Sequence, residues 1–165
     1  PVSWVRYWCS AVNAMRSVPG QRFAFDWNVA VGVGASSPEP AYPGDAYVDV
    51  ISADVYNVSF RQTPQPELWN MLFNAPVGLK WHETFADAHH KPMAFTEWAT
   101  GTRPDGFGGG DDPLFITNMA NWIKSNPVLY HNYWDYPAQD YNGRLSDGSK
   151  PKAAAAFLAT FGGGR

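Results

Sequence analysis

Hydrophobic residues follow two different periods along this chain, and the change from one period to the other predicts strands alternating with helices. Residues 3–17 place apolar side chains at every third or fourth position, which predicts an amphipathic helix with Ser3 as its cap. The apolar face of that helix would hold Trp4, Trp8, Val12 and Met15. Continuous runs rich in aromatic and branched residues predict four strands, at 22–32, 48–57, 92–98 and 128–136.

Helical spacing returns between these strands. It covers 65–90 with a break near the middle, and it resumes after a glycine-rich loop, where Asp112 is the expected cap. A last helix is predicted at 152–161, before the glycines at 162–164. Strands that alternate with helices indicate a parallel sheet of right-handed βα units. We therefore predict an α/β fold with a leading helix and a single domain over 1–165.

Composition narrows the possible functions. With 45% hydrophobic and 16% charged residues the chain can fold, and a net charge of −3 with scattered Lys and Arg argues against a nucleic-acid surface. No apolar run approaches the roughly 20 residues that cross a bilayer. The chain holds 8 Trp, 8 Tyr and 10 Phe, more than a core requires, and aromatic rings at a surface indicate a flat, partly apolar ligand such as a sugar. The single Cys9 is expected to be a buried thiol, and we expect no cofactor and no metal.

Polar and aromatic side chains close each of the four predicted strands. In parallel βα folds, binding and catalytic groups collect at the C-terminal ends of strands, because loops open to solvent there. The predicted strand ends carry Asp26, Trp27 and Asn28; Asp54, Tyr56 and Asn57; Glu97 and Trp98; and His131, Tyr133, Trp134 and Asp135. Most of these residue types also cap turns or fill cores, but Glu97 ends an apolar strand, where an unpaired carboxylate costs several kcal/mol. Glu97 is therefore the leading candidate for catalysis.

Three segments resemble a known group of enzymes. The pattern KPMAFTEW at 91–98 resembles the seventh strand of the clan of retaining (β/α)8 glycoside hydrolases, in which the glutamate ending that strand is the nucleophile. The segments YPGDAYVDVISADVYN at 42–57 and YHNYWDY to AAAAF at 130–157 resemble the sixth and eighth strands of glycoside hydrolase family 26, the β-mannanases and their relatives. The resemblance implies that Glu97 is the nucleophile, that Tyr56 orients it, and that Trp134 is the platform under the sugar nearest the cleaved bond.

The resemblance extends over only half of a barrel. A (β/α)8 barrel typically has about 250 residues and eight strands, whereas these 165 residues resemble strands five to eight. Retaining hydrolysis needs a second carboxyl group about 5 to 5.5 Å from the first, and the family's acid/base glutamate ends strand four. Glu39 is the best glutamate candidate for that role, because it follows the first strand on the expected active face. Asp26, Asp54 and the Glu97 of a second copy are the other candidates.

Three interpretations remain open at this point. Two half barrels could join as a homodimer and hydrolyse a β-linked mannan or glucan. A half barrel could instead bind glycans without cleaving them, or it could be an inactive remnant without its acid/base. Four parallel strands alone would expose an apolar edge and interior, including Met93 and Phe95, so self-association is expected.

We predict a half-barrel glycoside hydrolase that acts on a β-linked polysaccharide. The catalytic candidates are Glu97, Tyr56, Glu39 and Asp26. The expected substrate-binding residues come from all four strands: Trp27, Asn28, Asp54, Trp98, His131, Tyr133, Trp134 and Asp135. No part of the chain has the pattern of a signal peptide, and a polysaccharide substrate implies a secreted or periplasmic location.

Overall fold

The computed structural model describes residues 1–163, and within them the chain forms one four-stranded parallel sheet with helices against it. The strands, in their order across the sheet, are β1 (Asp26–Val31), β2 (Val50–Asn57), β3 (Met93–Thr100) and β4 (Val128–Tyr133). Every neighbouring pair is parallel. The predicted α/β fold is confirmed, and four parallel strands are half of what a (β/α)8 barrel requires. The last residues of the predicted domain, including Gly164 of the expected glycine run, lie outside the described residues.

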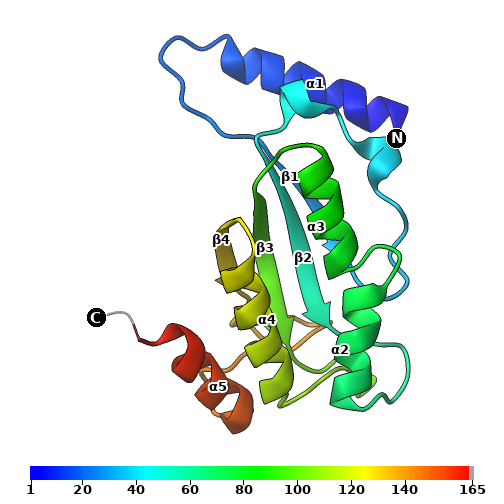
Figure 1. Cartoon of the computed structure of the whole chain (residues 1–165), viewed down its shortest axis with the longest axis vertical. Helices are drawn as coiled ribbons and strands as arrows, with labels where there is room; N and C mark the ends of the chain where they lie inside the picture. Colours follow the sequence, from blue (N-terminus) through cyan, green and yellow to red (C-terminus); the bar gives the residue numbers. More distant parts are fainter. Residues whose placement is uncertain (164–165) are drawn as a thin grey trace.

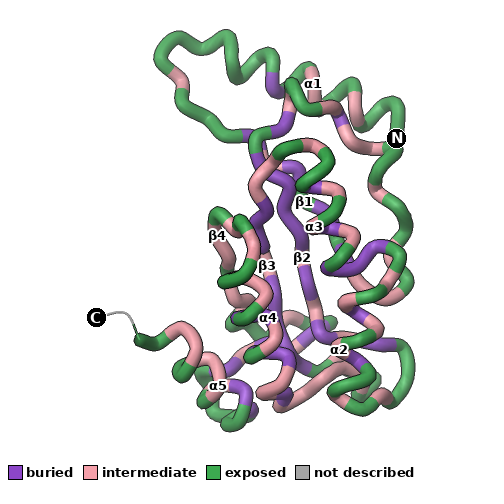
Figure 2. Tube along the Cα trace, viewed as in Figure 1, coloured by how far each residue is buried: buried purple, intermediate pink, exposed green. Residues whose placement is uncertain are grey.

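Four helices cover the sheet on one side (Figure 1). They are α2 (Gln65–Asn74), α3 (Leu79–Ala88), α4 (Pro113–Ser125) and α5 (Pro151–Phe161). The break expected within 65–90 separates α2 from α3. Buried residues follow β1, β2, β3 and the helix faces turned toward them (Figure 2), whereas the residues of β4 are half-buried or exposed. No helix in the described part of the chain has both the length and the apolar character that a bilayer span demands.

The hydrophobic core lies between the sheet and these helices. Trp98 of β3 is fully buried, and its ring centroid lies 6.1 Å from that of Phe115 in α4 and 6.0 Å from that of Phe157 in α5. Met93 and Phe95 are 1% and 0% exposed, so the prediction that they line an exposed interior was wrong. Both point toward the helices, because successive strand residues alternate between the two faces of a sheet.

The opposite face of the sheet, which we call the open face, is polar. It carries the side chains of Asp26, Asn28, Ser52, Asp54, Tyr56, Thr96, Glu97, Tyr130 and Asn132. The Tyr130 hydroxyl of β4 donates a hydrogen bond to the Asp26 carboxylate of β1, although these strands are at opposite edges of the sheet. In a flat sheet β1 and β4 would be separated by three inter-strand spacings of about 4.8 Å each, and the two side chains would point in parallel directions. The contact therefore requires the sheet to curl toward the open face, as barrel strands do.

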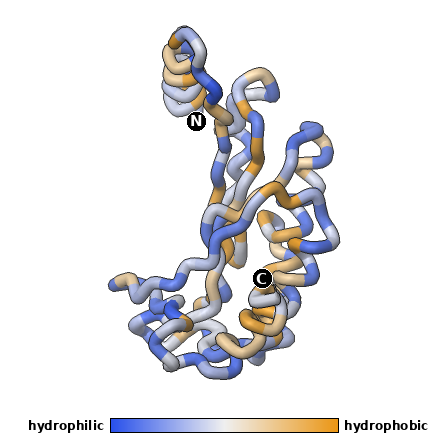
Figure 3. The backbone as a smooth tube through the Cα atoms, turned by 90° about the vertical axis from the view of Figure 1, so that its left-hand side faces the viewer, coloured by the Kyte–Doolittle hydropathy of each residue, from blue (hydrophilic) through white to orange (hydrophobic). Residues whose placement is uncertain are grey.

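The leading helix, α1 (Val2–Arg16), lies at the end of the molecule beyond the N-terminal ends of the strands (Figures 1 and 3). It is held by side-chain bonds to a loop, from Trp8 Nε1 to the Tyr47 oxygen at 2.9 Å and from Arg16 to the Ala46 oxygen at 2.7 Å. Its predicted apolar face is mostly outside the core, since Trp4 is 51% and Met15 is 38% exposed.

Two smaller expectations about α1 also differ from the structure. The helix begins at Val2, before Ser3, and no side chain caps it. Cys9 is half-buried rather than buried, with its sulfur 4.0 Å from the Pro43 carbonyl oxygen.

The glycine-rich loop between β3 and α4 is anchored by buried polar contacts. Asp112 accepts a hydrogen bond from the Phe115 amide at 3.0 Å, which confirms it as the cap of α4, a contact worth about 0.5–2 kcal/mol. Asn57, at the end of β2, donates to Asp112 at 2.8 Å and to Thr100 at 3.1 Å. A β-carbon on Gly109 would lie 2.0 Å from the Asn57 amide nitrogen, so only glycine fits there. These contacts fix the loop over the C-terminal ends of β2 and β3.

Candidate active site

A bulge in β3 presents Glu97 on the open face. Asp54 of β2 pairs with Glu97, but between this pair and the preceding one β3 has one more residue than β2. Such an insertion interrupts the alternation of side chains between the two faces. Thr96 and Glu97 therefore both bond to groups on the open face, while Phe95 and Trp98 on either side of them are fully buried.

The Glu97 carboxylate is oriented by a tyrosine of the neighbouring strand. The Tyr56 hydroxyl donates a hydrogen bond to Oε2 of Glu97, and no hydrogen bond among residues 1–163 occupies Oε1. Burial raises the pKa of Tyr56 well above its ordinary value, and the bond to Glu97 raises it further. Tyr56 therefore stays protonated and acts as a donor. Its ring packs edge-on against Tyr141, with 5.0 Å between centroids, which fixes the position of the hydroxyl.

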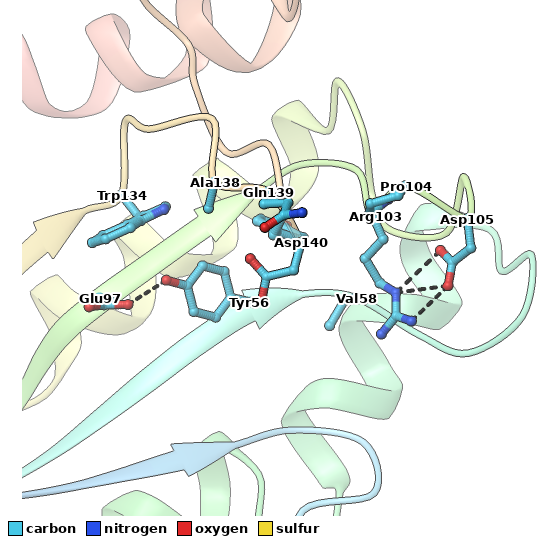
Figure 4. A pocket seen from close by; sticks show the side chains of 11 residues that line it. Tyr56, Val58, Glu97, Arg103, Pro104, Asp105, Trp134, Ala138, Gln139 and Asp140 are labelled. Carbon is cyan, nitrogen blue, oxygen red and sulfur yellow. Dashed lines mark hydrogen bonds and ion pairs between the residues drawn. The ribbon is translucent and has the colours of Figure 1, made fainter.

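Glu97 and Tyr56 line a pocket of about 860 Å³ at the C-terminal end of the sheet (Figure 4). Trp134 follows β4 directly and lies beside Glu97, and its amide donates to the Trp98 oxygen at 2.9 Å. The other lining residues come from the loops after β2, β3 and β4: Val58, Arg103, Pro104, Asp105, Ala138, Gln139, Asp140 and Tyr141. A pocket of this size, in which the Glu97 carboxylate lies beside the half-buried Trp134 indole, fits a small organic ligand.

The pocket carries more negative than positive charge. Glu97, Asp105 and Asp140 face one cation, Arg103. Asp105 is bound to Arg103 through contacts of 2.7 to 3.2 Å, and this hydrogen bonding lowers the pKa of Asp105 below its ordinary value. Because a carboxyl group with a lowered pKa holds its proton weakly, Asp105 is poorly suited to act as an acid. Asp140 has no such partner in the described residues.

Asp54 lies level with Glu97 on the open face. Its two oxygens accept hydrogen bonds from Asn28 Nδ2 at 2.9 Å and from Thr96 Oγ1 at 2.8 Å. The Asn28 oxygen in turn accepts from Ser52, and the Thr96 hydroxyl, which has one proton, also lies 2.7 Å from this oxygen. Asp54 and Asn28 therefore belong to a network on the open face that joins three strands, and neither lines the pocket around Glu97.

Asp26 was predicted near Glu97 but lies at the other end of the sheet. It is the first residue of β1, four residues before Ala30, the partner of Asp54. At about 3.3 Å per residue this separates it by about 13 Å from the level of Glu97. The error came from placing residues 26–28 at the end of the first strand, when they form its beginning. Asp26 is therefore too far from Glu97 to be its acid/base within one chain.

Glu39 also lies away from the pocket. The loop after β1 returns to the helix-covered side, and the Glu39 carboxylate accepts a hydrogen bond from Trp81 Nε1 of α3 at 2.9 Å. The prediction that Glu39 faces the active side was wrong, because the loop packs against α3 and α1 instead of remaining at the strand ends.

Two of the three tryptophans predicted to bind substrate are core residues. Trp27 is 2% exposed and packs on Tyr42, with 4.9 Å between centroids, and Trp98 is 0% exposed. Neither can stack on a sugar, because both side chains alternate to the helix-covered face. Trp134 is the predicted ring that does line the pocket.

Three further predicted residues lie on a different surface. His131 accepts a hydrogen bond from Trp98 Nε1 at 3.3 Å, and the Tyr133 hydroxyl lies 2.9 Å from the Gly143 carbonyl oxygen and 3.2 Å from that of Thr100. Asp135 accepts from backbone amides of the following loop. All three line a second groove of about 560 Å³ between β4 and α5, so the prediction that they share a site with Glu97 was wrong.

Several pocket residues were not predicted. Arg103, Asp105 and Asp140 lie in loops, and neither hydrophobic period nor motif spacing marks a loop position. The available signal was the loop after β3 itself, since the loops at the C-terminal ends of strands form the sites of parallel βα folds. Within residues 1–163 no group of three His, Cys, Asp or Glu side chains is placed to hold a metal ion.

Comparison with known proteins finds similarity in fold among solved structures. No protein-family model matches the chain, and no curated protein sequence matches it either. Among solved structures, the modular endo-β-1,4-mannanase of Cellulomonas fimi, described as a family 26 mannanase, matches 93% of this chain with a TM-score of 0.59 and 23% identity. The catalytic domain of the family 26 endo-β-1,4-mannanase from Bacillus sp. JAMB-750 matches 96%, with a TM-score of 0.62 and 21% identity. GH26C from Muricauda sp. MAR_2010_75 matches 94%, with a TM-score of 0.64 and 21% identity.

The matches are partial on the side of the known structures. The chain spans 35% of the Cellulomonas protein, 43% of the Bacillus domain and 41% of the Muricauda protein. At these identities the likeness concerns the fold. The chain is thus similar in fold to a part, less than half in length, of family 26 glycoside hydrolases.

Proposed function

We propose that this chain forms the nucleophile-bearing half of a retaining glycoside hydrolase that acts on a β-linked polysaccharide, mannan or glucan. The observation that carries the proposal is Glu97, which lies near the C-terminal end of a parallel strand, lines a pocket, accepts a hydrogen bond from Tyr56 and lies beside the half-buried indole of Trp134. The likeness in fold to family 26 endo-β-mannanases supports the same substrate class.

Each of these three residues has a distinct role in the proposal. Glu97 attacks the anomeric carbon and forms a glycosyl-enzyme intermediate, while the glycosidic oxygen leaves with a proton from a second carboxyl group. Tyr56 cannot deprotonate near neutral pH, so it holds one carboxylate oxygen in place and leaves the other to attack. Trp134 supplies an apolar surface for the C–H groups of the sugar ring.

The acid/base is the incomplete part of this site. Besides Glu97, Asp140 is the carboxyl group of the pocket that has no ion-pair partner within residues 1–163, and Asp54 lies level with Glu97 but accepts bonds from two donors. Neither stands at the end of a strand facing Glu97. We propose that a second (β/α)4 unit supplies the acid/base from across the open face.

Completion of the barrel would also pair the two edge strands of the sheet. β1 and β4 each have a neighbour on one side only within the described residues, and unpaired edges favour pairing with another chain. Leu158, which lines the groove along β4 and α5, is 68% exposed, and Leu129 of β4 is 62% exposed. For this chain alone we propose a second copy as the partner, giving a homodimer with two edge-to-edge contacts. Because the open face is polar, we expect the driving force for dimerisation to come from contacts at the sheet edges and at the groove.

The proposed substrate also bears on where the protein acts. Polysaccharides of this class are too large to enter a cell intact, so we propose that the protein acts in a secreted or periplasmic location. Fractionation of the source cells, followed by detection of the protein in the medium or periplasm, tests this. Recovery in the cytoplasm alone would contradict it.

The direct test is release of reducing sugar from β-mannan, β-glucan and xylan. We expect the wild-type chain to act on mannan or glucan and Glu97→Gln to lose at least about 1,000-fold, because the amide cannot act as the nucleophile. Glu83→Gln is the matched control, since it makes the same chemical change on α3, away from the pocket. Activity that survives Glu97→Gln would refute the assignment. Glycan binding without activity in either protein would make the chain a binding module.

A further inference from the structure

A second group of side chains lies at the end of the pocket remote from Trp134. Arg103 and Asp105 line that end (Figure 4), and the Arg103 guanidinium carbon lies 5.3 Å from the centroid of the Phe60 ring. We call Phe60, Arg103 and Asp105 the distal cluster. Phe60 follows β2 and the other two follow β3, so two adjacent strand-end loops meet there.

The guanidinium of Arg103 is held from two sides. Asp105 accepts from Arg103 Nε at 3.0 and 3.2 Å and from Nη2 at 2.7 Å, and Phe60 provides a cation–π contact on a face of the group. Hydrogen bonding to Asp105 raises the pKa of Arg103, so the group remains charged. No hydrogen bond among residues 1–163 uses Nη1.

The backbone of this turn is also ordered. The Arg103 amide donates to the Phe107 oxygen at 2.9 Å, the Gly106 amide donates to the Arg103 oxygen at 2.9 Å, and Gly106 has a φ of +81°. Asp105 Oδ1 accepts from the Phe107 amide at 3.1 Å. The donors of Arg103 are therefore fixed before any ligand arrives, which reduces the entropy lost on binding.

We propose that the distal cluster forms a second sugar subsite, in which Arg103 donates hydrogen bonds to hydroxyl groups of a pyranose ring while Phe60 and Asp105 hold the guanidinium in place. A planar guanidinium with free donors matches a pair of neighbouring hydroxyls. The sugar would be neutral, because Glu97, Asp105 and Asp140 outnumber Arg103 in the pocket and would repel a uronic acid. This inference rests on the proposed function, since it assumes that the pocket holds a glycan.

The test separates the two ends of the pocket by ligand length. Isothermal titration calorimetry would measure binding of β-1,4-manno- and β-1,4-gluco-oligosaccharides of two to six sugars to the full chain, in the Glu97→Gln background to prevent turnover. We expect Arg103→Ala to weaken binding of the longer oligosaccharides about tenfold and to leave the disaccharides unchanged. Arg103→Lys should recover part of the loss, because it keeps the charge without the planar fork.

Arg61→Ala is the matched control, because Arg61 is a neighbouring exposed arginine that pairs with Glu67 and does not line the pocket. Thermal unfolding of each variant checks that the fold is retained. Equal affinities for Arg103→Ala and Arg61→Ala at every length would overturn the inference, and so would a loss that is the same for short and long ligands. If the parent protein binds no oligosaccharide at all, the proposed function itself fails. Binding that is unaffected at Arg103 but lost in Trp134→Ala would leave the proposed function intact and refute the distal subsite alone.

Discussion

Mild acid should destabilise this chain through one buried histidine. His82 of α3 is fully buried, and its Nε2 lies 2.8 Å from the carbonyl oxygen of Ile51 in β2, the strand that carries Tyr56. Burial lowers the pKa of His82 from 6.5 to about 4, and the bond to the Ile51 oxygen offsets only part of that shift. His82 therefore folds in its neutral form.

The size of the effect follows from the two pKa values. Below pH 6.5 the unfolded chain binds a proton at His82 that the folded chain does not bind until about pH 4, so stability falls as the pH falls through this window. At pH 5 this difference in proton binding lowers the free energy of unfolding by about 2 kcal/mol, and at pH 7 it lowers it by only a few tenths of a kcal/mol. Ordinary carboxyl groups titrate mostly below this range, so a loss between pH 7 and pH 5 reports chiefly on histidine.

Urea unfolding followed by tryptophan fluorescence at pH 7 and pH 5 measures the loss. In His82→Gln the free energy of unfolding should be lower at both pH values, but the loss between them should shrink by about 2 kcal/mol. His131, whose pKa burial also lowers, accounts for part of the remaining loss. His90→Asn, a change at an exposed position, should keep the full wild-type loss. A pH dependence in His82→Gln equal to that of the wild type would refute the argument.

Four further outcomes test the site, the anchoring of the loop after β3 and the self-association. Tyr56→Phe removes the donor to Glu97 and should lower kcat about 10- to 100-fold, measured on the most active polysaccharide, whereas an unchanged kcat would mean that Tyr56 does not orient Glu97. Gly109→Ala should lower the free energy of unfolding by about 1–3 kcal/mol, because its β-carbon would lie 2.0 Å from the Asn57 amide, while Gly163→Ala, with open space around it, should change it by less than about 0.5 kcal/mol. If the acid/base is absent, aryl glycosides with good leaving groups should be cleaved far better than polysaccharide, and equal impairment would point to another cause. Light scattering should show a dimer, and a single species of monomer mass would refute self-association.

The sequence predicted the order of elements well, because strand and helix periods are local properties. The break between α2 and α3 and the cap at Asp112 follow from residue types with strong backbone preferences. Glu97 and Trp134, two of the predicted site residues, both line the pocket. Trp134 comes directly after β4, whereas Glu97 lies three residues before the end of β3 at Thr100, because that strand continues beyond its predicted end at 98.

The errors arose where a local pattern does not determine the tertiary contact. The run at 22–32 has strand character throughout, but only Asp26–Val31 pairs with β2, and Phe23 is 53% exposed. Which part of an apolar run enters the sheet depends on the strand that it pairs with. Because β1 begins at Asp26, this residue lies at the N-terminal end of the sheet and not at the predicted C-terminal end. Aromatic residues were difficult to assign for a similar reason. Trp27 and Trp134 are the same residue type, and the sequence alone does not show that Trp27 packs in the core while Trp134 lines the pocket.

The bulge in β3 shows most directly why the site cannot be read from alternation alone. With strict alternation, consecutive residues Thr96 and Glu97 would point to opposite faces, so the face that holds one would exclude the other. The inserted residue allows Thr96 to bond Asp54 and Glu97 to accept from Tyr56 on the same face, while Trp98 still enters the core. The bulge thus satisfies two demands together: the open-face network that joins three strands, and a carboxylate directed into the pocket. The local irregularity is therefore as much a part of the candidate site as Glu97 itself.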